Sequence, residues 1–172
     1  MDRKEEFTIT IYTENDIGLI NRIALLFFKM KINISSINAG PTEIFDVQRF
    51  TIVATDTEDN IRKLTYLLEK QVDVLKVYFH TNEELVWQEI ALYKVPTKIM
   101  ASQKKGIQIL REYKITIIAI RKDYTIFEVT GHRDEINELM EILKPLGLEE
   151  FSRSSRIALS KNGHGLNRII GE

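Results

Sequence analysis

The chain has 172 residues, of which 44% are hydrophobic and 28% charged, and its formal net charge at pH 7 is −1. These values are typical of a globular protein with one domain or two small ones, and they give no general attraction to nucleic acid or to an acidic membrane. The absence of cysteine excludes disulfides and thiolate metal sites. No apolar run has the ~20 residues that span a bilayer, and the charged N-terminus lacks the apolar run of a signal peptide, so we expect a cytoplasmic protein.

The first half of the sequence predicts four strands and two helices. Apolar and polar residues alternate in the expected strands, and apolar residues recur every three or four positions in the expected helices. Thr57 and the acidic residues that follow it are typical of a helix start. In chain order we predict strand 7–13, helix 18–31, strand 34–41, strand 47–55, helix 58–70 and strand 73–80. This βαββαβ order is that of a ferredoxin-like unit.

The second half repeats this order without copying the sequence. We predict strand 86–94, helix 97–112, strands 116–121 and 125–130 paired across 122–124, a helix that begins at 132–134, and a last strand over 149–159. The fold class is therefore α+β, with two ferredoxin-like βαββαβ units. The expected domains are 6–80 and 84–160, followed by a mobile tail over 161–172. Each unit of about 80 residues has a small core and a sheet face without helices, so we expect at least a dimer.

Gly18 lies where the first predicted strand turns into the first helix. Because glycine has no side chain, a ligand can approach the backbone there, and the unpaired N–H groups of the helix start favour a small carboxylate. Asn33 begins the next strand and is expected to close the same pocket from the other side, and Asp16 is expected to point outward. No catalytic group is near, which indicates a site that senses a small molecule. For Asn15 and Gly18 alone, an ordinary Asx turn is the alternative interpretation.

The order of strand, Asn-x-x-Gly turn, helix and Asn-Ile strand resembles the amino-acid-binding ACT domain. Further segments narrow the resemblance to one family, the regulatory (small) subunit of acetolactate synthase, also called acetohydroxyacid synthase. In the first half these are 38–43, 48–53 and 70–77, and in the second half 89–95, 124–131 and 158–161. The resemblance covers residues 6–161. The ordered series of segments is much more specific than the glycine turn alone.

The resemblance implies a non-catalytic regulatory subunit that binds a branched-chain amino acid for feedback inhibition, with valine as the first candidate. It also implies a homodimer that activates the large catalytic subunit of acetolactate synthase. Thiamine diphosphate, Mg²⁺ and FAD are then cofactors of that partner, and this chain holds none. By the same resemblance, the effector-binding residues are Asn15, Ile17, Gly18, Leu19, Ile20, Asn33 and Ile34.

Three positions depart from the residues usual in the family, namely Leu19, Ile32 and Ser35, which leaves the identity of the amino acid open. The alternative function is a free-standing ACT-domain sensor that regulates another enzyme or transporter. A large-subunit gene beside this one, or co-purification with that subunit, separates the two.

Other classes of function have less support in the sequence. His80, His132 and His164 are far apart and have no companion at metal-ligand spacing, so we expect no metal site. RNA-binding modules also use the ferredoxin-like plan, but they carry interleaved aromatic residues on the third strand. Here that strand offers Phe50 alone, so we expect no nucleic-acid partner.

Overall fold

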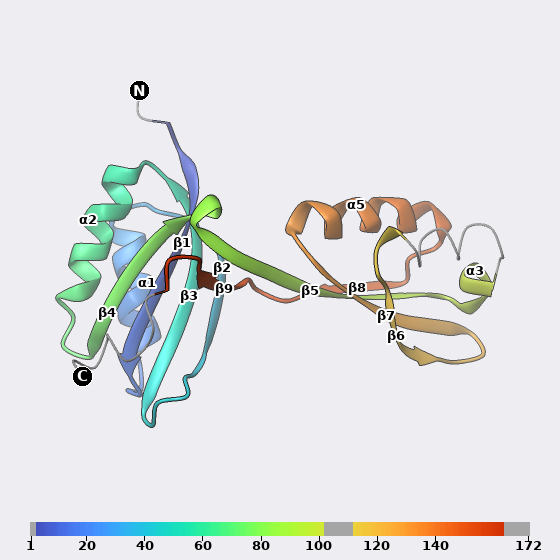
Figure 1. The fold of residues 1–172 in the computed structure, drawn as a ribbon, viewed down its shortest axis with the longest axis horizontal. Coiled ribbons are helices and arrows are strands. Elements are labelled where there is room, and N and C mark those ends of the chain that lie inside the picture. Colours follow the sequence, from blue (N-terminus) through green and yellow to red (C-terminus); the bar gives the residue numbers. More distant parts are fainter. Residues whose placement is uncertain (1–2, 102–111, 164–172) are drawn as a thin grey trace. The chain divides into compact units, whose positions relative to one another are not determined.

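The structure is a computed structural model of the chain, and it describes residues 3–101 and 112–163. It divides the chain into two compact units, one formed by residues 1–87 with 156–172 and the other by residues 88–155. Each unit contains an antiparallel sheet with helices on one face (Figure 1). Within the described ranges, no helix is long and apolar enough to cross a membrane.

The first unit has the predicted βαββαβ order. Its elements are β1 (Glu5–Glu14), α1 (Leu19–Lys29), β2 (Ile34–Pro41), β3 (Val47–Asp56), α2 (Glu58–Glu69) and β4 (Val74–Thr81). The strands form an antiparallel sheet in the order β2-β3-β1-β4, in which Ile9 of β1 pairs with Ile52 on one side and Phe79 on the other. Thr57 accepts a hydrogen bond from the Asn60 N–H at the start of α2, which confirms the predicted helix start.

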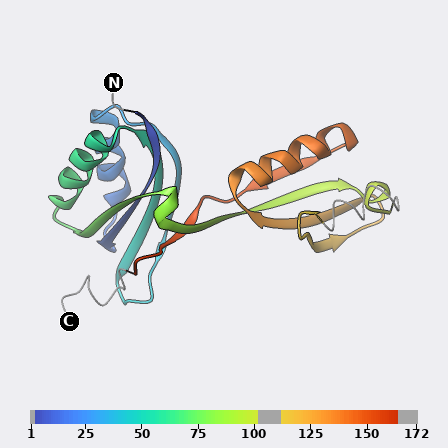
Figure 2. The same cartoon turned by 45° about the horizontal axis from the view of Figure 1, so that its top comes forward.

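Helices α1 and α2 cover one face of this sheet (Figures 1 and 2) and enclose the core of the unit. From α1, the core receives Leu19, Ile23 and Phe27. Ala24 and Phe28, which also follow the helical spacing, are exposed, and Phe28 is 76% exposed. Helix α1 has more apolar residues than one face can hold, so it presents a second apolar face away from the core.

The chain's own C-terminal segment covers part of the opposite, helix-free face of the sheet. This segment contains Arg156 and β9 (Ile157–Ser160), which pairs with β5 (Leu85–Pro96). Arg156 is only 1% exposed, and it donates hydrogen bonds to Thr8 Oγ1 at 2.8 Å, Asn82 Oδ1 at 2.8 Å and the Glu6 carboxylate at 2.6 Å. Its guanidinium carbon lies 3.6 Å from the centre of the Trp87 ring. The buried charge is therefore paired and hydrogen-bonded, as burial requires. The short 3₁₀ helix η1 (Asn82–Glu84) joins β4 to β5.

The second unit repeats the same sheet order, β6-β7-β5-β8, which confirms the second ferredoxin-like unit. Its further elements are α3 (Thr97–Ala101), β6 (Thr116–Ile120), β7 (Tyr124–Gly131), α5 (Arg133–Leu143), the 3₁₀ helix η2 (Lys144–Leu146) and β8 (Glu150–Arg153). The predicted hairpin of 116–121 and 125–130 is confirmed as β6 and β7. Of the helix predicted over 97–112, residues 102–111 lie outside the described residues. Tyr93 fixes α5 to the sheet, because its hydroxyl donates to the Ile136 carbonyl at 2.7 Å.

The single last strand predicted over 149–159 is wrong, because the structure has two strands there, β8 and β9. The ladder ends after Arg153, where Ser154 bonds the backbone of Ile90 through its N–H and hydroxyl. Residues 156–160 then belong to the first compact unit. The domain limits 6–80 and 84–160 predict which parts of the chain fold independently, and they stay a prediction. Of the tail predicted over 161–172, Lys161 is bonded to the Glu83 and Glu84 carbonyls, and residues 164–172 lie outside the described residues.

Candidate functional site

Gly18 forms the turn between β1 and α1 and is the N-cap of the helix. Its backbone angles, φ 87° and ψ 0°, are in the left-handed region that favours glycine. No side chain caps the helix start. A Cβ atom at residue 18 would meet no atom within 4 Å. The backbone of this turn is therefore open to a ligand.

Two N–H groups at the start of α1 are available as donors. The Asn21 and Arg22 N–H groups approach the Gly18 carbonyl at 3.0 and 3.4 Å. By contrast, the N–H groups of Gly18 and Ile20 have no acceptor in the described part of the chain. Unpaired N–H groups at a helix start carry partial positive charge, so a carboxylate is the ligand group that suits them.

An ion-pair network holds the turn in place. Arg22, on the first turns of α1, contacts the Asp16 carboxylate at 2.6 Å and also the carboxylate of Asp73, which precedes β4. Because Arg22 neutralises Asp16, that carboxylate repels an anionic ligand less. The sequence analysis missed the role of Arg22. Asp73 is 51 residues away from Arg22 and lies in one of the segments of the family resemblance, but nothing local indicates the pairing.

Asn15 is fixed by the neighbouring strand. Its Oδ1 accepts a hydrogen bond from Gln48 Nε2 at 2.5 Å, and its N–H donates to the Asp46 carbonyl at 3.1 Å. Asn15 and Gln48 line a cavity of about 430 Å³ together with Pro41 and the turn between β2 and β3. Gln48, which the sequence analysis did not assign to the site, therefore sets the orientation of the Asn15 amide.

The predicted apolar residues of the site lie in two different environments. Leu19 was expected to be among the effector-binding residues, but it is 2% exposed and packs into the core. Ile17 is 99% exposed, Ile20 is exposed, and Ile34 is half-buried at the start of β2. In one chain, Ile17 and Ile20 are thus the apolar side chains available beside the Gly18 turn.

Asn33 is exposed and lies at the other end of the sheet from the Gly18 turn. Its neighbour Ile34 pairs with Ala54, and Ala54 pairs with Phe7 near the start of β1. The Gly18 turn follows the end of β1, and the 11 residues of α1 separate the two places by about 16 Å along the helix. The structure therefore does not bring Asn33 and Gly18 together within one chain, because the helix runs from one end of the sheet to the other.

Within residues 3–101 and 112–163, no three His, Cys, Asp or Glu side chains are grouped so that they could hold a metal ion. His164 lies outside these ranges. The features that the turn itself offers are N–H donors, one amide and apolar side chains, which suit binding of a small molecule.

Comparison with known proteins agrees with this architecture. Residues 88–162 match the family model described as the small subunit of acetolactate synthase, and residues 9–76 match the AHAS small subunit-like ACT domain. The chain is 36% identical to the acetolactate synthase small subunit of Bacillus subtilis over 154 residues, 89% of each chain. It is 29% identical to that of Mycobacterium bovis over 92% of this chain and 94% of the relative.

A solved structure shows the same fold over nearly the whole chain. The crystal structure of the acetolactate synthase small subunit from Thermotoga maritima aligns with a TM-score of 0.81 and 26% identity, over 91% of this chain and 98% of that one. The resemblance drawn from the sequence is thereby confirmed. The chain belongs to the family of acetolactate synthase small subunits, with an ACT domain in its N-terminal half.

Proposed function

We propose that this protein is a regulatory subunit that binds a branched-chain amino acid, with valine as the first candidate, and thereby lowers the activity of the acetolactate synthase catalytic subunit. It also activates that subunit, in the cytoplasm, and contributes no catalytic group. Thiamine diphosphate, Mg²⁺ and FAD are assigned to the catalytic partner. The observation that carries the proposal is the helix start at Gly18, which no side chain caps and where a Cβ atom would meet only open space.

In this proposal the effector carboxylate binds the N–H groups of Gly18 and Ile20. The Asn15 amide, held by Gln48, fixes the polar end of the amino acid. Ile17 and Ile20 border the aliphatic side chain, and Leu19 acts from the core by anchoring the first turn of the helix.

A second copy of the chain completes the site. Strand β2 is at the edge of the first sheet, so its backbone can pair with β2 of another copy. Antiparallel pairing about a twofold axis brings the start of each strand against the end of the other. The end of β2, Pro41, pairs with Gln48, which holds Asn15. The second copy's Asn33 and Ile34 would then lie beside the Asn15 end of the first copy, although they are distant within one chain.

Exposed apolar side chains also support the dimer. Ile20 and Phe28 are exposed on the outer face of α1, Ile17 is exposed just before the helix, and Phe45 in the turn between β2 and β3 is almost fully exposed. A second copy and an aliphatic effector would remove such side chains from water, with a gain of roughly 25 cal/mol per Å² buried. The effector inhibits only if it binds the less active arrangement more tightly, and a coupling of ~1–3 kcal/mol gives the usual scale of inhibition.

The test compares two substitutions of the same residue. Gly18→Asp and Gly18→Asn add side chains of similar size, and both residues tolerate the left-handed backbone better than most. Asp adds a negative charge where the effector carboxylate must bind, whereas Asn does not. Holoenzyme rebuilt with Gly18→Asp should lose feedback inhibition by valine and keep its activation, and Gly18→Asn should retain more of the inhibition.

The control measurement is the activity of the catalytic subunit with each variant in the absence of amino acid. If Gly18→Asp is inhibited with an unchanged midpoint, the effector binds elsewhere and the proposal fails. If activation is lost as well, the sensing and partner surfaces overlap, and only their separation is wrong.

A further inference from the structure

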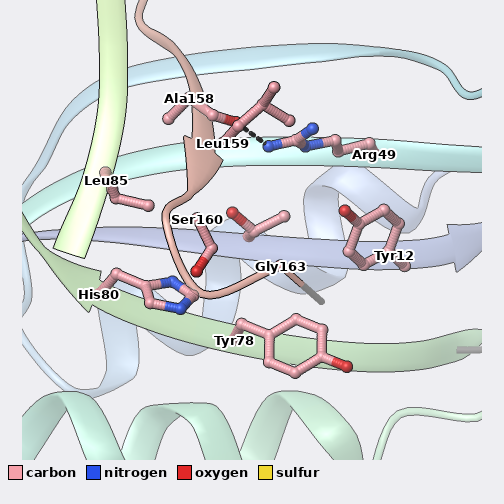
Figure 3. Close-up of a pocket in the computed structure, with 10 residues that line it drawn as sticks. Tyr12, Arg49, Tyr78, His80, Leu85, Ala158, Leu159, Ser160 and Gly163 are labelled. Atoms are coloured by element: carbon pink, nitrogen blue, oxygen red, sulfur yellow. Dashed lines mark hydrogen bonds between the residues drawn. The ribbon is translucent and has the colours of Figure 1, made fainter. Parts of the chain in front are cut away.

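The helix-free face of the first sheet contains a second cavity, which the proposed effector site does not use. It has a volume of about 260 Å³, and we call it the sheet-face cavity. Its floor is formed by β1, β3 and β4, and its wall by β9 and the turn that follows (Figure 3). All of these segments belong to the first compact unit. The volume is slightly below the range of about 300–1,000 Å³ that is typical of ligand pockets, so it suits a molecule with one ring.

Three aromatic rings line this cavity on neighbouring strands. Tyr12 comes from β1, and Tyr78 and His80 come from β4 (Figure 3). The ring centres of Tyr12 and Tyr78 are 6.4 Å apart with the planes at 80°, and those of Tyr78 and His80 are also 6.4 Å apart. Aromatic rings in such arrangements offer faces and edges to a further planar ring.

Arg49 supplies a positive charge with an unused donor. Its Nη2 donates to the Ala158 carbonyl of β9, and its guanidinium lies 5.8 Å from the centre of the Tyr12 ring. Its Nε is buried and has no hydrogen-bond partner among the described residues. Because protein atoms enclose this nitrogen, a ligand in the cavity meets Arg49 mainly through the positive charge of its guanidinium, which a carboxylate or phosphate complements best.

The other groups of the cavity are compatible with an anion. None of the described residues that line it is acidic. Burial raises the pKa of the Tyr12 hydroxyl, and the nearby Glu43 and Tyr78 raise it further against the opposite effect of Arg49, so this hydroxyl is protonated at neutral pH and can donate. The Ser160 hydroxyl adds a further polar group to the wall.

We propose that the sheet-face cavity is a second ligand site, for a small molecule with one planar ring and one anionic group, a carboxylate or a phosphate. Arg49 binds the anionic group, and the rings of Tyr12 and Tyr78 contact the planar ring. This site is separate from the Gly18 turn, and the proposal does not depend on the identity of the effector there.

Titration calorimetry of the full chain tests the proposal with four probes. Benzoate and phenyl phosphate carry both features, acetate carries only the charge, and benzyl alcohol carries only the ring. Benzoate or phenyl phosphate should bind with one site per chain, at least about tenfold more tightly than acetate or benzyl alcohol. Stronger binding of one of the two aromatic anions identifies the preferred anionic group. No saturable binding of either up to about 10 mM, or equal binding of all four, would overturn the proposal.

Substitutions test whether the aromatic anion binds in the sheet-face cavity. Arg49→Gln and Tyr78→Leu should each weaken the aromatic anion at least about tenfold, and Arg62→Gln, on the exposed surface of α2, is the matched control. Tyr78→Leu does not alter the bond from Arg49 to β9, so it keeps the test valid if Arg49→Gln loosens that strand. Gly18→Asp should leave the affinity for benzoate unchanged. If Gly18→Asp abolishes benzoate binding, or if valine competes with benzoate, there is one site and not two.

Discussion

Replacing Arg156 by methionine should destabilise the first unit by a large and measurable amount. Methionine keeps an unbranched apolar stem against Trp87 but removes the guanidinium. The substitution therefore deletes the hydrogen bonds to Thr8 and Asn82, the ion pair with Glu6 and the contact between the cation and the Trp87 ring.

The expected loss of unfolding free energy follows from how deeply Arg156 and its partners are buried. Breaking a buried ion pair costs about 3–5 kcal/mol, because the other charge is left uncompensated. The Glu6 side chain is partly exposed and can be rehydrated, which reduces this cost, whereas Thr8 is fully buried and loses its partner. We expect a loss of about 3 kcal/mol. With a dependence on urea of about 2 kcal/mol per M, the unfolding midpoint should fall by about 1.5 M.

The assay is urea unfolding of the full chain at one protein concentration, followed by tryptophan fluorescence. Trp87 is the only tryptophan of the sequence and is in contact with Arg156, so the signal reports on this unit. Arg62→Met is the matched control, because Arg62 is exposed on α2 and pairs with Glu58 one helical turn away. It should cost about 1 kcal/mol or less. An Arg156→Met midpoint equal to that of Arg62→Met would refute the reasoning from burial.

Three further outcomes are expected. Asn33→Ala should raise the valine concentration for half-inhibition of the rebuilt holoenzyme roughly 10- to 150-fold. This corresponds to the loss of one hydrogen bond to a charged group, about 1.5–3 kcal/mol. An unchanged midpoint would show that Asn33 is not part of the site. Sedimentation at about 20 µM should show a dimer, and a monomer would contradict the pairing through β2. The hydrogen bond from the Thr81 N–H lowers the pKa of Glu84 below its ordinary value of 4.5, so its contribution to stability is present above that pH and lost below it. The stability difference between wild type and Glu84→Gln should thus shrink below pH 4.5, and a constant difference in urea midpoints across that range would argue against the assignment.

Local patterns in the sequence were enough to predict most of the fold. The strands of the first unit and both of its helices were predicted to within a few residues, because alternation, helical spacing and the Thr57 cap are properties of neighbouring residues. The exception is the last strand. Its division into β8 and β9 depends on Arg156 reaching Glu6, Thr8 and Asn82, which are between 74 and 150 residues away in the chain.

The same limit applies to the candidate site. The conformation of Gly18 was predictable, because a strand turns into a helix there and a left-handed backbone favours glycine. The burial of Leu19 was not, because Leu19 and Ile20 are both apolar and only the rotation of α1 against the sheet decides which of them is buried. The pairing of Arg22 with Asp73 depends on where β4 begins relative to α1, which no local pattern indicates.

The place of Arg156 in the sequence has a consequence for biosynthesis. Proteins are made from the N-terminus, and domains commonly fold as they leave the ribosome. Arg156, which bonds Thr8 and contacts Trp87, is made after the whole second unit, residues 88–155. A nascent chain that ends before residue 156 therefore lacks the guanidinium that its first unit needs, and its helix-free sheet face stays open during synthesis. The first unit can therefore complete this part of its sheet face only after β9 has been made, which is after the second unit.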